Sequence, residues 1–152
     1  MIKFTIVTIT YNAADVFMRT ADSVARQTYA AVEHLIIDGA SSDGTQNLAE
    51  EYKKASNAAC NGHEVRIISE PDKGLYDAMN KGRRLATGDY VCFLNAGDFF
   101  PSADTLAVIA ANARLEECSS EGKPLPGVLY GDTDWVDNDG NYMSRRRLTP
   151  PE

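Results

Sequence analysis

Hydrophobic residues along the chain form short β-branched runs that alternate with stretches of helical spacing. Residues 3–9 (KFTIVTI) form the first run, a polar break follows, and residues 13–27 then carry apolar side chains at helical spacing. The same unit recurs, with further strands expected at 31–38, 63–70 and 88–95 and further helices at 41–56, 72–87 and 101–119. Strands that alternate with helices of this length imply crossover connections. The pattern therefore predicts an α/β fold with a largely parallel sheet covered on both faces.

The boundaries of two helices carry local signals. Ser42 or Asp43 is a suitable N-cap for the second helix, and Pro101 suits the first turn of the fourth. The pattern changes beyond that helix. A loop rich in Gly, Pro, Ser and Lys leads to an expected strand at 128–136, a DNDG turn and residues 141–148. We expect a hairpin at the C-terminal end.

Composition narrows the class of protein. The 152 residues are 43% hydrophobic and 24% charged, which is typical of one globular domain. The net charge of −7 disfavours binding to nucleic acid. No apolar run is long enough to span a bilayer, and the three cysteines lack C-x-x-C spacing, which fits a reducing compartment. These features favour a cytoplasmic location.

Polar residues follow each expected strand. In an open parallel sheet ligands bind beyond the carboxyl ends of the strands, so these residues mark the expected site. They are Thr8, Thr10, Tyr11 and Asn12 after the first strand, Asp38, Gly39 and Ser41 after the second, Glu70, Asp72 and Lys73 after the third, and Asn95, Gly97 and Asp98 after the fourth.

The absence of three well-known motifs narrows the range of ligands that the chain could bind. The chain has no G-x-x-x-x-G-K-[ST], no G-x-G-x-x-G after the first strand and no G-x-S-x-G, which argues against P-loop NTPases, dinucleotide-dependent oxidoreductases and α/β-hydrolases. A carboxylate after the second strand can accept hydrogen bonds from a ribose or a base. One after the fourth, which we expect near the sheet centre, can hold a divalent cation. A cation that bridges a diphosphate would let this acidic protein bind an acidic ligand.

Four segments in order resemble a known family. Together they are similar to the inverting glycosyltransferases of family 2, in particular the bacterial branch that builds capsular, exopolysaccharide and lipopolysaccharide sugars. The resemblance extends from about residue 3 to residue 134. The segments are TIVTITYNAADVFMRTADSVARQTY, LIIDGASSDGT, SEPDKGLYDAMNKGRRLATGDYVCFLNAGD and VLYGD.

The resemblance implies a GT-A type, Rossmann-like fold, a nucleotide-diphospho-sugar donor and a Mg²⁺ or Mn²⁺ ion. Asn95-Ala96-Gly97-Asp98 stands where many relatives have Asp-x-Asp-Asp, so Asp98 resembles the metal ligand and Asn95 replaces the first acid. Gly97 occupies the place of the acid that often contacts the donor ribose. This motif is therefore a reduced one with a single clear carboxylate.

The other site residues implied by the resemblance lie on the donor side. IIDGASSDGT stands where many relatives have two successive acids, of which Asp38 remains and Gly39 takes the second place. Asp38 is thus a candidate for the base or ribose contact, and a shared site requires that Asp38 and Asp98 open on one crevice. The loop that packs along the nucleoside is matched by Thr10, Tyr11 and Asn12. Asp77 and Asn80 lie in a motif that faces the donor in relatives, although helix capping or helix surface explains them equally well.

The family's reaction is a single displacement with inversion, in which a base deprotonates a hydroxyl of a glycan or lipid-linked acceptor. The base is usually an acid well downstream of the metal motif, and this chain stops at Glu152, so we assign no catalytic residue. We therefore expect residues 1–152 to be a single, truncated domain, the donor-binding part, with the acceptor part beyond it. That part would also provide any association with the inner face of the membrane.

Two alternatives of other classes stay open. A nucleotidyltransferase that modifies nucleotide-sugars shares the α/β plan and the metal-dependent diphosphate chemistry. It would need a glycine-rich loop with Lys or Arg after the first strand, which TYNAADVF lacks. A non-catalytic sugar-nucleotide binding module remains compatible with the length of the chain.

Overall fold

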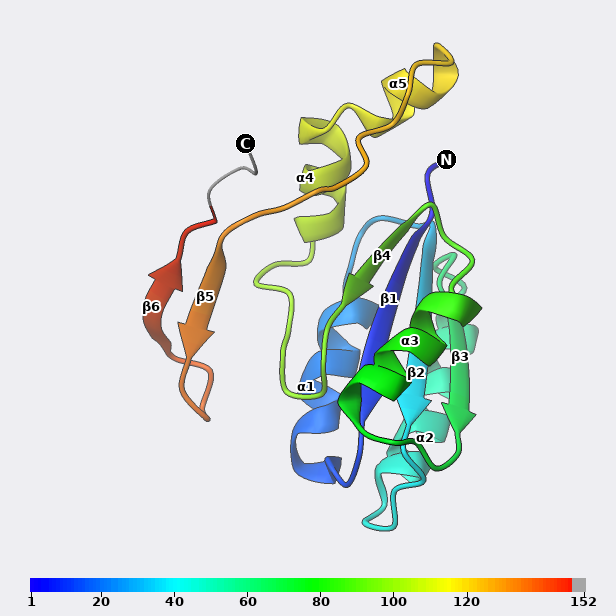
Figure 1. Cartoon of the computed structure of the whole chain (residues 1–152), viewed down its shortest axis with the longest axis vertical. Coiled ribbons are helices and arrows are strands. Elements are labelled where there is room, and N and C mark those ends of the chain that lie inside the picture. The colour runs from blue at the N-terminus through cyan, green and yellow to red at the C-terminus, as the bar shows by residue number, and fades with distance from the viewer. Residues whose placement is uncertain (149–152) are drawn as a thin grey trace.

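The computed structural model describes residues 1–148 and has two sheets (Figure 1). A four-stranded parallel sheet has the order β3-β2-β1-β4, and a two-stranded antiparallel sheet pairs β5 with β6. The strands are β1 (Phe4–Thr10), β2 (Val32–Asp38), β3 (Glu64–Ser69), β4 (Tyr90–Phe93), β5 (Thr133–Val136) and β6 (Tyr142–Arg146). The helices are α1 (Ala14–Ala25), α2 (Thr45–Ala59), α3 (Leu75–Leu85), α4 (Thr105–Asn112) and α5 (Leu115–Ser120).

The register brings the carboxyl ends of the central strands level with one another. Thr10 of β1 lies opposite Asp38 of β2, which lies opposite Ser69 of β3. The predicted parallel α/β architecture and the C-terminal hairpin are confirmed. The expectation for the fourth strand was wrong: within residues 1–148, β4 pairs only with β1 and lies at the edge of the sheet, not near its centre.

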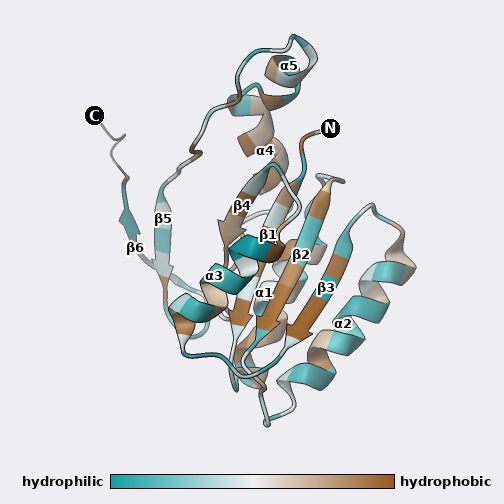
Figure 2. Ribbon diagram, turned by 45° about the vertical axis from the view of Figure 1, so that its right-hand side comes forward, coloured by the Kyte–Doolittle hydropathy of each residue, from teal (hydrophilic) through white to brown (hydrophobic). Residues whose placement is uncertain are grey.

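Helices cover both faces of the parallel sheet. Figure 1 shows α1 and α2 behind the sheet and α3 in front of it. Because side chains alternate along a strand, Ile6 packs with the α1 and α4 side, while Val7 packs with the α3 side. Helix α3 approaches closely because Gly82 has no side chain; a Cβ there would lie 2.4 Å from a methyl group of Val7. In Figure 2 the parallel strands are mostly brown, whereas α2 and α3 carry much teal, as expected of helices with one face in solvent.

The fourth predicted helix is two helices. Arg114 has a left-handed backbone with φ of 52°, and it separates α4 from α5. In a continuous helix Leu115 would lie on the side opposite Leu106, whereas the break allows both to be fully buried in one cluster. Pro101 also lies outside the helix, since α4 begins at Thr105 after Asp104 as N-cap. Tertiary packing therefore overrides the local helical pattern.

Two other boundaries differ from expectation. The predicted strand at 128–136 is reduced to Thr133–Val136, because β6 supplies pairing partners only over that stretch. Helix α2 has Gly44 as its N-cap, with a left-handed φ of 102°, in place of Ser42 or Asp43. Asp43 lies one residue earlier and accepts hydrogen bonds from the backbone N–H of Thr45 at 3.0 Å and of Ala14 at 2.9 Å. It therefore joins the starts of α1 and α2.

None of the helices within residues 1–148 combines the length and the apolar character needed to cross a bilayer.

His34 is a fully buried histidine on the α1 and α2 side of β2. Its Nε2 pairs with the Thr8 hydroxyl at 2.9 Å, and its Nδ1 pairs with the Tyr52 hydroxyl at 2.8 Å. Burial, followed by the nearby His63, lowers the pKa of His34 to about 3. The folded protein therefore holds this ring neutral where an unfolded chain would bind a proton.

We predict that this ring makes the protein sensitive to mild acid. Between its unfolded pKa and its folded pKa the unfolded chain binds the extra proton, so the free energy of unfolding falls as the pH falls. From pH 7.5 to pH 5 the loss is about 2 kcal/mol. Urea unfolding at the two pH values measures it. His34→Gln should remove most of this difference, whereas His63→Gln should retain it; an equal difference in all three proteins would contradict the assignment.

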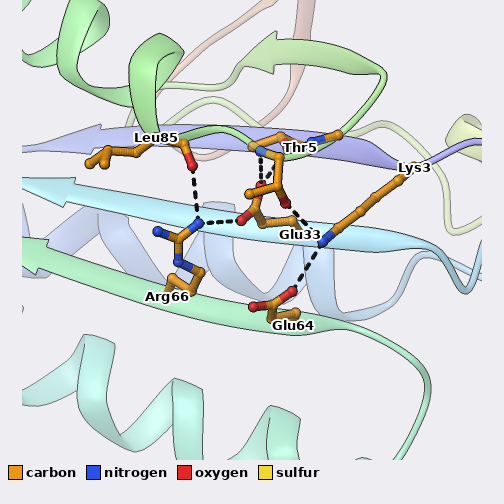
Figure 3. Close-up of polar contacts among 8 residues, drawn as sticks. Lys3, Thr5, Glu33, Glu64, Arg66 and Leu85 are labelled. Carbon is orange, nitrogen blue, oxygen red and sulfur yellow. Dashed lines mark hydrogen bonds and ion pairs between the residues drawn. The ribbon is translucent and has the colours of Figure 1, made fainter.

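A second buried polar cluster lies on the α3 side of the sheet (Figure 3). Glu33, which is 0% exposed, accepts hydrogen bonds from Arg66 Nη1 and the Thr5 hydroxyl, each at 2.6 Å, and from Thr87 N–H at 2.8 Å. Arg66 also donates to the carbonyl oxygen of Leu85 at 3.0 Å. Burial opposes ionisation of Glu33, but the bonds from Thr5, Thr87 and Arg66 outweigh it and lower its pKa. The cluster fixes the C-terminal end of α3 onto the sheet.

Candidate functional site

A cavity of about 330 Å³ opens at the carboxyl edge of the parallel sheet. This is the edge at which the sequence places the ligand, and the volume falls in the range of small-molecule sites. The wall comes from the end of β1, the loop that joins β3 to α3, and the residues that follow β4. It consists of Ile9, Thr10, Tyr11, Ala13, Asp72, Gly74, Leu75 and Ala96.

Two buried polar atoms at this edge have no hydrogen-bond partner within residues 1–148. They are the hydroxyl of Thr10, which lines the cavity, and Oδ1 of Asn95. The two chain segments are adjacent, since Ala96 N–H donates to the carbonyl of Ile9 at 3.1 Å. Buried polar groups are nearly always paired, so these two atoms are exceptions at the edge where the cavity opens.

Tyr11 and Asn12 occupy the loop after β1 but differ in exposure and contacts. Tyr11 lines the cavity and is 67% exposed, so its ring is available for stacking. Asn12 has a left-handed φ of 47°, and its side-chain oxygen accepts from Ser42 N–H at 2.9 Å while its own N–H donates to the Ser41 hydroxyl at 2.8 Å. Asn12 therefore joins the loops after β1 and β2, and a direct donor contact through it stays a prediction.

Asp38 is enclosed at the end of β2. It is 1% exposed, and its carboxylate accepts hydrogen bonds from Ser41 N–H at 3.0 Å, from the Ser41 hydroxyl and from the Ser69 hydroxyl at 2.6 Å. The expectation that Asp38 and Asp98 open on one crevice was therefore wrong, because Asp38 uses its oxygens to fix the loop after its own strand. Neither carboxylate lines the cavity.

Asp98 lies in an irregular segment that is held by one polar side of α1. The Thr20 hydroxyl accepts from Gly97 N–H at 2.9 Å and donates to the carbonyl of Asp98 at 2.6 Å. Further along, the Ser23 hydroxyl accepts from Phe100 N–H at 3.2 Å, and Gln27 bonds the backbone of Ser102 and Leu106. Polar residues at positions 20, 23 and 27 have helical spacing, which was the sequence signal for this contact and was missed.

Arg19 adds a second attachment to the same segment. Its Nε donates to the carbonyl of Gly97 at 3.1 Å, its guanidinium lies 5.2 Å from the centre of the Phe99 ring, and Nη1 donates to the carbonyl of Asn138 at 3.0 Å. Because Asn138 lies in the turn between β5 and β6, Arg19 joins α1, the segment around Asp98 and the hairpin.

The Asp98 side chain itself is exposed, and no donor within residues 1–148 bonds to its carboxylate. The same residues contain no group of three or more His, Cys, Asp or Glu arranged to hold a metal ion. Mg²⁺ and Mn²⁺ bound with phosphates usually keep several waters and take one or two protein carboxylates. Asp98, with Asn95 nearby, fits a cation of that kind.

The loop between β3 and α3 contributes Asp72, one of the polar residues that the sequence placed after the third strand, although the family resemblance gave it no role. Asp72 lines the cavity, whereas Asp77 accepts from Lys73 N–H at 3.1 Å in the first turn of α3. This bond ties the first turn of α3 to the loop before it, and the donor contact of Asp77 stays a prediction. Asn80 is exposed and does not line the cavity, so its donor contact stays a prediction.

Comparison with known sequences gives one family and several named relatives. The family described as Glycosyl transferase family 2 matches residues 5–143. A PGL/p-HBAD biosynthesis glycosyltransferase of Mycobacterium tuberculosis is 43% identical over 129 residues, which are 85% of this chain and 46% of that protein. An uncharacterized glycosyltransferase of Escherichia coli, YibD, is 31% identical over 78% of this chain and 34% of its own length. The chain thus spans less than half of these curated relatives.

Solved structures agree on the fold. The mannosyltransferase PcManGT from Pyrobaculum calidifontis, in complex with GDP-Man and Mn²⁺, matches with a TM-score of 0.61 and 28% identity over 70% of this chain and 30% of that one. Staphylococcus aureus TarS 1–349, in complex with UDP-GlcNAc, matches with a TM-score of 0.59 and 22% identity over 74% of this chain and 32% of its own. The latter likeness concerns the fold alone.

Proposed function

The chain belongs to glycosyl transferase family 2, and from this we propose that it forms the part of a glycosyltransferase that binds a nucleotide-diphospho-sugar donor together with a divalent cation. One observation carries the proposal. The cavity at the carboxyl edge of the parallel sheet is lined by an exposed aromatic ring, that of Tyr11, together with the polar residues Thr10 and Asp72. A stacking surface beside polar side chains suits a nucleoside.

The relatives add support for the donor class. PcManGT was solved with GDP-Man and TarS with UDP-GlcNAc, so proteins of similar fold bind nucleotide-sugars with different bases. For this chain we propose the shared chemistry, a nucleoside diphosphate linked to a sugar. The contacts of Thr10 and Tyr11 with the nucleoside are part of this proposal, while Asp38 stabilises the adjoining loop.

We propose Asp98 as the ligand of Mg²⁺ or Mn²⁺, with Asn95, three residues earlier, as a second polar residue at the site. When bound, such a cation supplies Lewis-acid stabilisation of the departing nucleoside diphosphate. The residues of this chain keep Asp98 in place: Thr20 and Arg19 fix the backbone on which it lies. An acidic protein with a net charge of −7 needs a cation of this kind to accept a diphosphate.

The remaining features of the activity are proposals for the whole protein. We propose transfer with inversion to a glycan or lipid-linked acceptor in the synthesis of cell-surface polysaccharide, in the cytoplasm at the inner membrane face. No residue is assigned as the base. In the hairpin region Asp134 pairs with Arg145, and Asp137 accepts from the N–H groups of Asp139 and Asn141, so both carboxylates are already engaged.

The experiment that tests the donor proposal is a titration of the purified chain with GDP and UDP, with and without Mn²⁺, by isothermal titration calorimetry. We expect at least one of them to bind in a metal-dependent manner. If neither binds with Mn²⁺ present, the donor-site proposal is wrong. Binding without sugar transfer by a longer form of the protein would instead support a non-catalytic binding module.

A further inference from the structure

The Asp72 carboxylate lies where a side chain at residue 39 would be, and Gly39 leaves that space free. Gly39 follows the last residue of β2, and a Cβ built there would lie 2.9 Å from Asp72 Oδ2 and 3.1 Å from the Tyr11 ring. The first distance is one that real Cβ atoms do not show. The carboxylate of Asp72, which comes from the loop between β3 and α3, therefore fills the place of a side chain at residue 39.

This position is the one at which a second acid is missing from the sequence. The resemblance of the sequence to family 2 implies two successive acids where this chain has Asp38 and Gly39, and here Asp38 is enclosed by Ser41 and Ser69. Asp72 supplies a carboxylate at the same point from another loop. The cavity wall therefore contains an acid after all, although the sequence of β2 does not show it.

Only one of the two oxygens of the Asp72 carboxylate accepts a hydrogen bond within residues 1–148. Oδ1 accepts from Gly74 N–H at 2.8 Å, and no donor within residues 1–148 bonds to Oδ2. Since each carboxylate oxygen can accept two hydrogen bonds, Oδ1 also retains acceptor capacity. Asp72 thus presents two acceptor oxygens in the wall of the cavity, beside the ring of Tyr11.

A carboxylate that offers two neighbouring acceptor oxygens can distinguish the four common bases. Guanine has adjacent N1–H and N2–H₂ donors on one edge, which match the two oxygens of a carboxylate. Uracil offers one N–H between two carbonyl oxygens that a carboxylate repels. Adenine and cytosine offer an amino group beside a ring nitrogen acceptor, which a carboxylate also repels.

From these contacts we propose that Asp72 is a specificity-determining residue that selects a guanine nucleotide, with the base against Tyr11 and its N1–H and N2–H₂ groups donating to the Asp72 carboxylate. The inference rests on the proposed donor site and specifies its base. Among residues 1–148, Asp72 is the one acid that lines the cavity; Asp38 is enclosed, and Asp77 accepts from Lys73 N–H.

The test compares GDP, inosine diphosphate and UDP by calorimetry in the presence of Mn²⁺. Inosine diphosphate shares the ring, ribose and phosphates of GDP but lacks the 2-amino group, so it isolates one hydrogen bond. We expect the wild-type chain to bind GDP about 10-fold or more tightly than the other two, since a hydrogen bond to a charged group contributes a factor of this order. In Asp72→Asn the preference for GDP should fall to within about 3-fold.

Asp22→Asn is the matched control, since it changes an exposed carboxylate of α1 that lies outside the cavity wall, and it should retain the preference for GDP. A second variant, Gly39→Ala, should displace Asp72 and weaken the preference while it leaves Asp72 chemically intact. Equal binding of the three nucleotides by the wild type would overturn the base assignment alone. So would an equal loss for all three in Asp72→Asn. Failure of every nucleotide to bind with Mn²⁺ would instead overturn the donor site itself.

Discussion

Replacing Asp98 by alanine is expected to abolish the metal-dependent part of donor binding, with a loss of affinity of at least about 100-fold in the presence of Mn²⁺. The reason is the isolation of this carboxylate. The resemblance to family 2 implies acids at the positions of Asn95 and Gly97, so the motif of this chain offers a single clear anionic ligand for a cation. The Asp98 carboxylate is exposed and has no hydrogen-bond partner within residues 1–148, so its removal should cost the fold little.

Calorimetric titration of the preferred nucleoside diphosphate, with Mn²⁺ and with EDTA, measures this effect. Wild type and Asp98→Ala should bind equally weakly in EDTA and differ only with Mn²⁺. Asp15→Ala, which removes another exposed carboxylate from the start of α1, is the matched control and should behave as wild type. If Asp98→Ala keeps its response to Mn²⁺, the cation is held elsewhere and the role given to Asp98 is wrong.

The architecture was predictable because its signals are local. The strand expected at 31–38 is β2 at Val32–Asp38, and the run at 3–9 becomes β1 at Phe4–Thr10, since each buried strand is rich in apolar and β-branched residues and ends at a polar break. The same alternation of strands and helices predicted the parallel sheet with helices on both faces. The edge of the sheet that carries the cavity followed from the topology alone.

What the sequence did not indicate depends on contacts between distant segments. Asp38 is enclosed through Ser69, which lies 31 residues further along the chain. Asp72 reaches the cavity because Gly39 leaves room for it, a relation that no local pattern records. Likewise the break before Leu115 follows from burial against Leu106 and not from helix propensity. In each case tertiary packing decided between local alternatives of similar quality.

The contribution of the buried cluster around Glu33 to the stability of the fold can be tested separately. Replacing Arg66 by leucine should lower the free energy of unfolding by about 3 kcal/mol, because it leaves a buried carboxylate without its cation. This value is at the lower end for buried pairs, since the Arg66 side chain is 32% exposed and water can partly replace it, whereas Glu33 is 0% exposed. The hydrogen bonds from Thr5 and Thr87 remain, but they do not neutralise the charge.

The double variant Arg66→Leu/Glu33→Gln separates charge from packing. The neutral amide still accepts the hydrogen bonds of Thr5 and Thr87 but no longer needs a cation, so the double variant should recover about half of the stability lost by Arg66→Leu. Urea unfolding at pH 7.5 measures both proteins. A double variant no more stable than the single one would mean that Arg66 acts through its contact with Leu85 and its packing, not through the ion pair with Glu33 that fixes α3 onto the sheet.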